Sequence, residues 1–379
     1  MAQRQLDPTD PTTAGPAKLA GPAGPVSCEA LADYLRTQAT EFLRALRLHR
    51  ESGTGSSASP GEEPVDAARS LRHAARRITG TLHTFRPLLD PTWAEAMHPE
   101  LAWLSGTLAR EHAYAARLER LLLALHRLSG ATPIPTQVAV GSRSAGADPV
   151  PPKAEPGIAG APSQAPTPDR ANLTLGAARA GALLERQLTL ARTRAHSAAL
   201  QALGSSRFHA VADNVAVLAS EVPLTPAAVS TPTDLRPLAA AAHERLCDAV
   251  TALPLLTAGH PYNAEALVHG LSFDPAPHPQ DAPWHHVRLL LRLRRYAHEV
   301  LEGDEARVDV RMLTAGTALN RHRDASEAAA AAAAAARTPR IAPATAYALG
   351  VLHADQRHEV EAARFAFQQS WEKKAVSTR

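Results

Sequence analysis

Apolar residues recur at helical spacing along most of the chain. In residues 28–50, Leu31, Leu35, Phe42 and Leu46 fall largely on one face, which is the pattern of an amphipathic helix. The same periodicity predicts long helices over residues 28–50, 65–86, 95–129, 172–203, 234–254, 284–301, 306–337 and 343–374, with shorter ones near 206–221 and 260–271. No run alternates between apolar and polar residues over the length of a strand. The sequence therefore predicts an all-α protein.

Two segments interrupt this pattern. Residues 1–26 and 131–170 are rich in proline and lack periodic apolar residues, a composition typical of disorder. A stretch rich in glycine and serine, from Glu51 to Glu63, predicts a loop. We therefore expect a disordered tail (1–26), a first helical part (27–130), a disordered insert (131–170) and a second helical part (171–375).

Composition supports this fold class and narrows the possible functions. Of 379 residues, 45% are hydrophobic but only 4% are aromatic, so the cores must be built from alanine, leucine and valine rather than from typical β-sheet residues. Forty basic residues against 37 acidic ones leave a net charge of +3, and nearly all the basic residues are arginines. A charge this small excludes a polyanion binder that uses its whole surface, so any such binding must occur at a local patch.

The sequence indicates a protein of the cytoplasm. Two cysteines are too few for a disulfide scaffold or a four-cysteine zinc site. The N-terminus has no apolar core of a signal peptide, and the alanine run 328–336 is too short to span a bilayer.

Basic residues form a stripe along the predicted helix at 65–86. Arg69, Arg72, His73 and Arg76 fall within one arc, with Arg77 at its edge. No acidic residue occurs between Asp66 and Asp90, whereas the solvent-facing side of a helix usually mixes charges of both signs. An anion-binding face and the ordinary charged surface of a bundle helix both remain open here.

A second stripe lies on the predicted helix at 284–301. It consists of His285, Arg288, Arg292, Arg295 and Tyr296, and the flanking positions are mostly leucine and valine. A helix this apolar should be buried on several sides, which would place its arginines beside an interior groove where unpaired charge is costly. An external polyanion could neutralise them. Alternatively, acids on neighbouring helices could form an internal ion-pair network; the candidates are Asp324, Glu244 and Asp248.

Sequence motifs of catalysis are missing. The chain has no glycine-rich phosphate loop, no nucleophile elbow, no E-x-E-x-K and no H-E-x-x-H. The adjacent His285 and His286 diverge by about 100° on a helix and cannot chelate one metal ion together. We therefore expect neither an enzyme nor a metal or cofactor site.

A set of ordered motifs resembles the CHAD family (conserved histidine α-helical domain). The motifs are R-x-x-R-x-x-x-R-R from Arg69, L-x-x-F-R-x-x-L from Leu82, E-L-x-W-L-x-G-x-L from Glu100, W-H-x-V-R-x-x-x-R-x-x-R-Y from Trp284, L-x-x-H-R-D-A from Leu319 and L-G-x-L-H from Leu349. They cover about residues 28–374, interrupted by the proline-rich insert. Both arginine-bearing helices also precede a Gly-Thr pair, at residues 106–107 and 316–317, an order that a duplicated four-helix unit would produce.

The resemblance implies a fold, a ligand and a set of contacts. It implies two pseudo-symmetric four-helix bundles with a basic groove between them that binds inorganic polyphosphate without catalysis. It also implies a polyphosphate-metabolising partner protein and a cytoplasmic location, including polyphosphate granules. The implied primary contacts are Arg69, Arg72, Arg76, Arg77, His285, Arg288, Arg292, Arg295, His322 and Arg323. Secondary positions are His73, Tyr296, His353 and Arg357.

This chain departs from the family pattern at several positions. Arg69 replaces a histidine, Thr79 replaces an arginine, and Leu290 and Leu293 stand where many members carry a basic residue. His112-Ala113 replaces an Arg-Asp pair. These changes imply a groove that is less positive than in other members.

Two other functions remain open. A helical scaffold whose groove has become structural could act through a protein partner; its arginine stripes would face different surfaces or be closed by acids. Binding of nucleic acid fits less well because Tyr296 is the only aromatic residue in the stripes that could stack on a base, and we expect no membrane binding.

Overall fold

The computed structural model describes residues 26–54, 63–130, 168–231, 233–260, 271, 278–303 and 309–372. Within these ranges every regular element is a helix, which confirms the predicted all-α class. The predicted tail and insert lie outside the described residues, except for residue 26 and residues 168–170. No helix in the described ranges is both long enough and apolar enough to cross a bilayer.

The long helices follow the predicted segments closely. Their bounds are α1 Cys28–Thr54, α2 Glu63–Thr84, α3 Pro91–Ser129, α4 Pro168–Leu203, α5 Ser206–Ser220, α7 Arg236–Thr251, α10 Ala282–Glu302, α11 Val310–Ala336 and α12 Pro343–Glu372. Four short elements were not predicted: η1 Arg86–Leu88, α6 Pro226–Ser230, α8 Leu255–Ala258 and η2 Pro279–Asp281. The helix expected near 260–271 lies, apart from its two end residues, outside the described residues.

Local chemistry explains where several helices begin and end. The side chains of Asp90, Ser205 and Asp309 each accept a hydrogen bond from a backbone N–H in the first turn of the helix that follows, which satisfies a donor that has no partner inside the helix. Gly130 ends α3 with φ 63°, a left-handed conformation that glycine adopts without steric cost.

In the described part of the chain, the buried apolar side chains form three clusters rather than one core. The first joins α1, α2 and α5 with the beginning of α3. The second joins the end of α3 with α4, α11 and α12, and the third lies among α7, α10, α11 and α12. Because α3 contributes to two clusters and α10 contributes its opposite ends to two, these long helices connect the parts of the molecule. The division into two pseudo-symmetric bundles stays a prediction.

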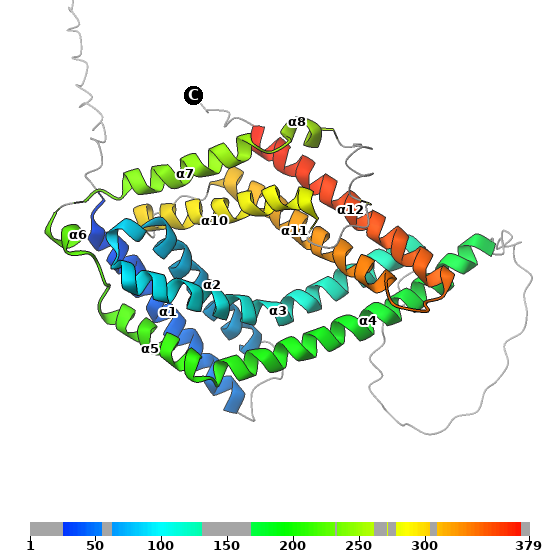
Figure 1. Cartoon of the computed structure of the whole chain (residues 1–379), viewed down its shortest axis with the longest axis horizontal. Helices are drawn as coiled ribbons and strands as arrows, with labels where there is room; N and C mark the ends of the chain where they lie inside the picture. The colour runs from blue at the N-terminus through cyan, green and yellow to red at the C-terminus, as the bar shows by residue number, and fades with distance from the viewer. Residues whose placement is uncertain are drawn as a thin grey trace, which may run out of the picture.

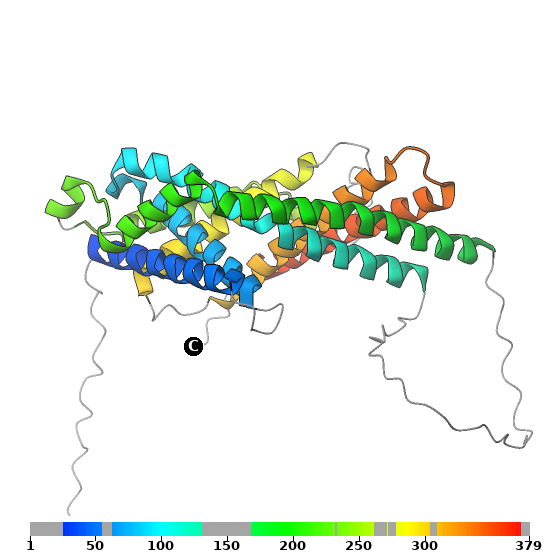
Figure 2. The ribbon, with the colours of Figure 1, turned by 90° about the horizontal axis from the view of Figure 1, so that it is seen from below.

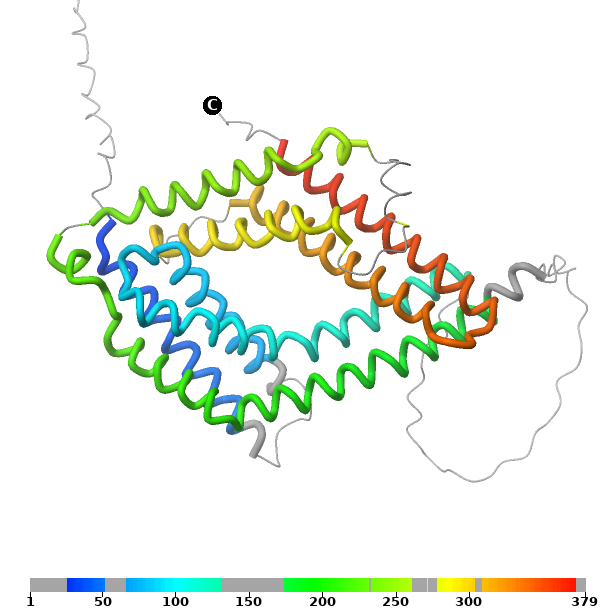
Figure 3. The backbone as a smooth tube through the Cα atoms, in the orientation of Figure 1, coloured from blue at the N-terminus to red at the C-terminus, as the bar shows by residue number. Residues whose placement is uncertain are grey.

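The helices are arranged around a central region of an elongated molecule. In Figure 1, α2 and α3 run along one side of this region and α10 and α11 along the other, and the tube in Figure 3 follows the same path. Figure 2 shows that α3 and α4 run side by side along the length of the molecule. The two helices predicted to carry arginine stripes, α2 and α10, therefore lie on opposite sides of the central region.

Gly80 allows α2 and α10 to approach each other closely. A Cβ atom at this position would lie 2.5 Å from Cδ2 of Tyr296 and 3.3 Å from Cδ2 of Leu293, so any larger residue would force the helices apart. The contact sets the separation of the two arginine stripes.

Candidate functional site

A cavity of about 650 Å³ lies between α2, α3, α10 and α11. We call it the arginine cavity because nine arginines line it together with two carboxylates, those of Asp324 and Glu327. The arginines are Arg72, Arg76, Arg77, Arg117, Arg120, Arg288, Arg292, Arg295 and Arg323. Both predicted stripes contribute to this one cavity rather than to separate surfaces.

Helical spacing explains how α2 and α10 present these side chains. Arg72 and Arg76 are four residues apart, as are Arg288 and Arg292, so each pair projects from one face of its helix. The opposite faces are buried, with Leu71 and Ile78 in the first core cluster and Val287 in the third. The predicted secondary positions His73 and Tyr296 also line the cavity.

Glu299 neutralises one edge of the cavity. Its carboxylate lies 3.0 Å from Nε of Arg77 and 3.2 Å from Nε of Arg295, and it accepts a hydrogen bond of 2.8 Å from the Tyr34 hydroxyl. Burial and the charge of Glu299 raise the pKa of Tyr34, so the hydroxyl keeps its proton and donates it. Two of the nine arginines are thus held by an internal acid.

Glu327 neutralises another part of the cavity wall. It pairs with Arg323 at 2.7 Å and with Arg117. Burial would raise the pKa of Glu327, but the two arginines outweigh it and the pKa is lowered. Nearby, Arg120 donates to Oε1 of Gln356 at 2.6 Å and lies 3.6 Å from Glu359. Five of the cavity arginines therefore have acidic partners.

The other four arginines have no ion pair among the described residues, and they lie at the centre of both predicted stripes. Arg76 donates to the Ser105 hydroxyl at 3.0 Å, and Arg288 donates to Oδ1 of Asn320 at 2.7 Å. In the described part of the chain, the Nε atoms of Arg72 and Arg292 are buried without a hydrogen-bond partner. We call these four the unpaired arginines.

All four unpaired arginines have lowered pKa values, because their surroundings disfavour the charged form of each side chain. Burial is the largest cause, followed by the charges of neighbouring arginines, and together they lower the pKa of Arg288 to about 9 and that of Arg76 to about 10. Burial and nearby arginines also lower the pKa values of Arg72 and Arg292. The four guanidinium groups repel one another, and an anion placed between them would relieve that repulsion.

Three predicted contacts lie outside the arginine cavity. Arg69 pairs with Asp66 at 3.6 Å and lines a smaller adjoining cavity of about 220 Å³. His285 packs edge-on against the His322 ring, with the ring centres 5.4 Å apart. His353 lies with Nδ1 3.0 Å from the Ala329 carbonyl.

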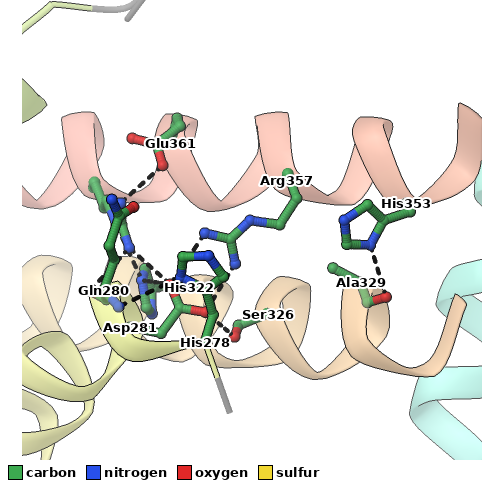
Figure 4. A network of polar contacts seen from close by, with 10 residues as sticks. His278, Gln280, Asp281, His322, Ser326, Ala329, His353, Arg357 and Glu361 are labelled. Carbon is green, nitrogen blue, oxygen red and sulfur yellow. Dashed lines mark hydrogen bonds and ion pairs between the residues drawn. The ribbon is translucent and has the colours of Figure 1, made fainter. Parts of the chain in front are cut away.

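Two further predicted residues belong to a buried polar cluster (Figure 4). At its centre is Asp281, fully buried, which accepts hydrogen bonds from Arg357 at 2.8 Å and Arg364 at 2.7 Å. Burial would raise the pKa of Asp281, but the hydrogen bond and charge of Arg357 and the hydrogen bond from Ser326 outweigh it and lower the pKa to about 2. His322, 1% exposed, stacks on Trp284, and burial together with the charge of Arg364 lowers its pKa to about 3. Arg357 and His322 thus hold α10, α11 and α12 together.

Sequence reasoning missed several residues of the cavity. Arg117 and Arg120, three residues apart on α3, line it beside His112 and Asn320. Their i, i+3 spacing was the available signal, but α3 carries charges of both signs and no uninterrupted stripe. Leu290 and Leu293, where a lower groove charge was expected, pack in the third apolar cluster instead, so they do not line the cavity.

The described ranges were also searched for side chains that could bind a metal ion. No group of three histidine, cysteine or carboxylate side chains there could hold a metal ion.

Comparison with known proteins gives a family and a close structural relative. The CHAD domain family matches residues 37–333. The solved structure entitled "PptA from Streptomyces chartreusis" is 64% identical, covers 92% of this chain and 100% of its own, and superposes with a TM-score of 0.72. The crystal structure of the CHAD domain from the plant Ricinus communis is 16% identical, with coverages of 90% and 92% and a TM-score of 0.47. A search of curated protein sequences gave no match.

Proposed function

This chain belongs to the CHAD domain family, and we propose that it binds inorganic polyphosphate in the arginine cavity. The family is linked to polyphosphate. The observation that carries the proposal is the group of unpaired arginines, which come from both α2 and α10 and face one cavity. A ligand with closely spaced negative charges and no other recognition feature fits them.

The chemistry of the two partners is complementary. Arginine presents a planar fork of N–H donors that matches the spacing of phosphate oxygens. Such charge-assisted hydrogen bonds contribute roughly 1.5–3 kcal/mol each when they are shielded from water. A micromolar complex requires about 8 kcal/mol, so shielded contacts from the four unpaired arginines are of the size that such a complex needs.

We propose binding without catalysis, because the CHAD domain is a helical domain of a non-catalytic kind. The protein would then act by holding polyphosphate, either at polyphosphate granules or beside a polyphosphate-metabolising protein. The competing function, a scaffold acting through a protein partner, accounts for the five arginines that acids neutralise. It leaves the four unpaired arginines without a purpose.

Removing two unpaired arginines tests the proposal. The double variant Arg288→Ala/Arg292→Ala should bind a defined long-chain polyphosphate about 100-fold more weakly, since each lost contact costs roughly one power of ten. The affinity is measured by isothermal titration calorimetry, and thermal unfolding followed by circular dichroism checks that the fold is intact.

The matched control is Arg110→Ala/Arg179→Ala, which removes the same charge from exposed positions outside the cavity. It should retain affinity within about twofold. Equal affinity of the Arg288/Arg292 variant and this control would rule out the cavity as the binding site. A second titration in the presence of DNA checks specificity: strong displacement of polyphosphate by DNA would favour binding of nucleic acid instead.

A further inference from the structure

Another cavity, distinct from the one that Arg69 lines, opens beside the arginine cavity between α10 and α11. Its volume is about 360 Å³. Arg288, Arg292, Arg295 and Asn320 line both cavities, so the two cavities meet at these side chains. A ligand whose phosphates contact these arginines in one cavity could place a different chemical group in the other.

Apolar side chains distinguish this α10–α11 pocket from its neighbour. Leu291, Met312 and Leu313 line it, and the side chain of Leu313 is left 58% exposed. Gly316 also lines the pocket, and a Cβ atom there would lie 3.2 Å from Cδ2 of Leu291. The missing side chain lets Leu291 of α10 pack closely against α11 at this side of the pocket. An inorganic phosphate chain has no apolar part that would benefit from such a surface.

Polar groups at the rim could fix the orientation of a bound ring. Thr317, His298 and Asp309 line the pocket, but each already has a partner: the Thr317 hydroxyl donates to the Leu313 carbonyl, His298 pairs with Glu302, and Asp309 lies 3.6 Å from Arg294. The oxygens of Thr317, Asp309 and Glu299 on this lining can still accept hydrogen bonds from exocyclic amines. The guanidinium planes of the shared arginines can also stack on a flat aromatic ring. Small-molecule pockets of about 300–1,000 Å³ typically combine a largely apolar lining with a few placed polar groups.

We propose that the two cavities together form a site for a nucleoside polyphosphate. The phosphate chain contacts the unpaired arginines, and the base enters the α10–α11 pocket. The inference rests on the proposed function for the phosphate part, and it adds a class of ligand that a phosphate-only groove would not distinguish.

The test compares three ligands with the same number of phosphates: tripolyphosphate, ATP and GTP, titrated without divalent cations. Tripolyphosphate carries at least as much negative charge as either nucleotide, so charge alone would make it the tightest ligand. We expect at least one nucleotide to bind about tenfold more tightly than tripolyphosphate because of its base. Tripolyphosphate binding as tightly as both nucleotides would overturn the inference.

Filling the pocket separates the contribution of the base from that of the phosphates. Gly316→Leu should abolish the advantage of the nucleotide while leaving long-chain polyphosphate affinity unchanged. The matched control is Gly106→Leu on α3, where a Cβ atom meets nothing within 4 Å, and it should retain the advantage. If Gly316→Leu does not fold, Leu313→Gln at the exposed wall gives the same test by removing apolar surface without changing charge.

Failure of the nucleotide proposal can be distinguished from failure of the polyphosphate proposal. If long-chain polyphosphate binds but no nucleotide outcompetes tripolyphosphate, the nucleotide inference is wrong and the proposed function stands. If wild-type protein binds none of these ligands at low salt, the proposed function fails. If the nucleotide advantage survives both Gly316→Leu and Leu313→Gln, the base binds elsewhere and the assignment of this pocket is wrong.

Discussion

Asp324 is the carboxylate that most directly opposes an anion in the arginine cavity. It lines the cavity and interacts electrostatically with Arg288 and Arg323. Burial raises its pKa despite the charge of Arg323, which indicates that its ionised form is poorly compensated. A bound phosphate would lie close to this negative charge.

We therefore expect Asp324→Asn to bind polyphosphate more tightly than wild type, by about fivefold, because removing a partly exposed carboxylate relieves less than about 1 kcal/mol of repulsion. Calorimetric titration at low salt measures the change. Asp213→Asn on α5 serves as the control, because it removes the same charge from an exposed acid outside the cavity lining. An affinity that falls in Asp324→Asn would mean that Asp324 positions Arg288 or Arg323 for binding.

Some residues of the cavity could be predicted from the sequence, and the position of His322 could not. Arg72, Arg76, Arg288 and Arg292 follow from helical spacing and from the resemblance, and all line one cavity. The placement of His322 does not follow, because periodicity defines a face of α11 without saying which helix covers it. Packing against α10 and α12 buries His322 beside Asp281, whereas its neighbour Arg323 reaches the cavity. The polyphosphate role of all these residues stays a prediction.

At the scale of elements, the contact between Gly80 and Tyr296 sets how far α2 lies from α10. Gly80→Ala would place a Cβ atom 2.5 Å from the Tyr296 ring, and such overpacking typically costs about 1–3 kcal/mol. Because the two stripes would also move apart, polyphosphate affinity should fall together with stability. Chemical denaturation and titration of the same variant measure both effects.

Gly106→Ala is the matched control on α3. A Cβ atom there meets nothing within 4 Å, so the substitution should stabilise the helix by up to about 1 kcal/mol and leave affinity unchanged. If Gly80→Ala is as stable as this control, the α2–α10 contact adjusts without cost and does not set the separation of the stripes.

The buried cluster around Asp281 joins three helices and should make the protein sensitive to acid. His322 has a pKa of about 3, below its value of about 6.5 in an unfolded chain. Its contribution to stability is therefore present above pH 6.5 and is lost progressively as the pH falls toward 3. Asp281, with a pKa of about 2 against about 3.9 unfolded, adds a further loss between about pH 4 and pH 2.

We expect the urea midpoint of wild type to fall between pH 7 and pH 4.5, because in this range the unfolded chain binds a proton at His322 that the folded chain excludes. His322→Gln, which lowers stability at pH 7, should show a smaller fall over the same range. His358→Gln, at an exposed position on α12, should fall as wild type does. Equal falls in all three proteins would contradict the buried neutral state of His322.

Helix prediction succeeded where the apolar pattern was long and failed where elements were short. The helix α3 spans many turns, so its apolar pattern outweighs a single unfavourable residue such as Pro99. The helix α11 is long for a different reason, because its second half is a run of alanine, the residue that most favours helix. The five-residue α6 and the four-residue α8 are too short to show a period. Their formation depends on local caps, for example the Thr225 hydroxyl that accepts from the Ala228 amide, and on packing.

At the scale of the whole molecule, the net charge of +3 conceals a strong local imbalance. Nine arginines and two carboxylates line one cavity, while other charges in the described ranges form ion pairs of one arginine with one acid on the surface, such as Arg36 with Asp33 and Arg207 with Glu100. Composition alone could show that a polyanion site must be local. Only the packing of four helices shows which arginines share it.

The dependence of polyphosphate affinity on salt concentration should show how many of these arginines contact the ligand. An arginine that releases a bound counterion contributes to the slope of log affinity against log salt, by about 0.7 per contact for a single-stranded polyanion. An arginine already paired with Glu299 or Glu327 exchanges one anion for another and contributes little. The four unpaired arginines therefore predict a slope of about −3, whereas nine acting arginines would give about −6.

Titrations of polyphosphate across several salt concentrations measure this slope. In Arg288→Ala/Arg292→Ala it should fall to about half, to roughly −1.5, while Arg110→Ala/Arg179→Ala should keep the wild-type value. A wild-type slope near −6 would mean that the five arginines with acidic partners leave their carboxylates to bind the ligand; they are Arg77, Arg117, Arg120, Arg295 and Arg323. The ion pairs of the cavity would then be the resting state of a site that rearranges on binding, rather than a fixed frame around four arginines.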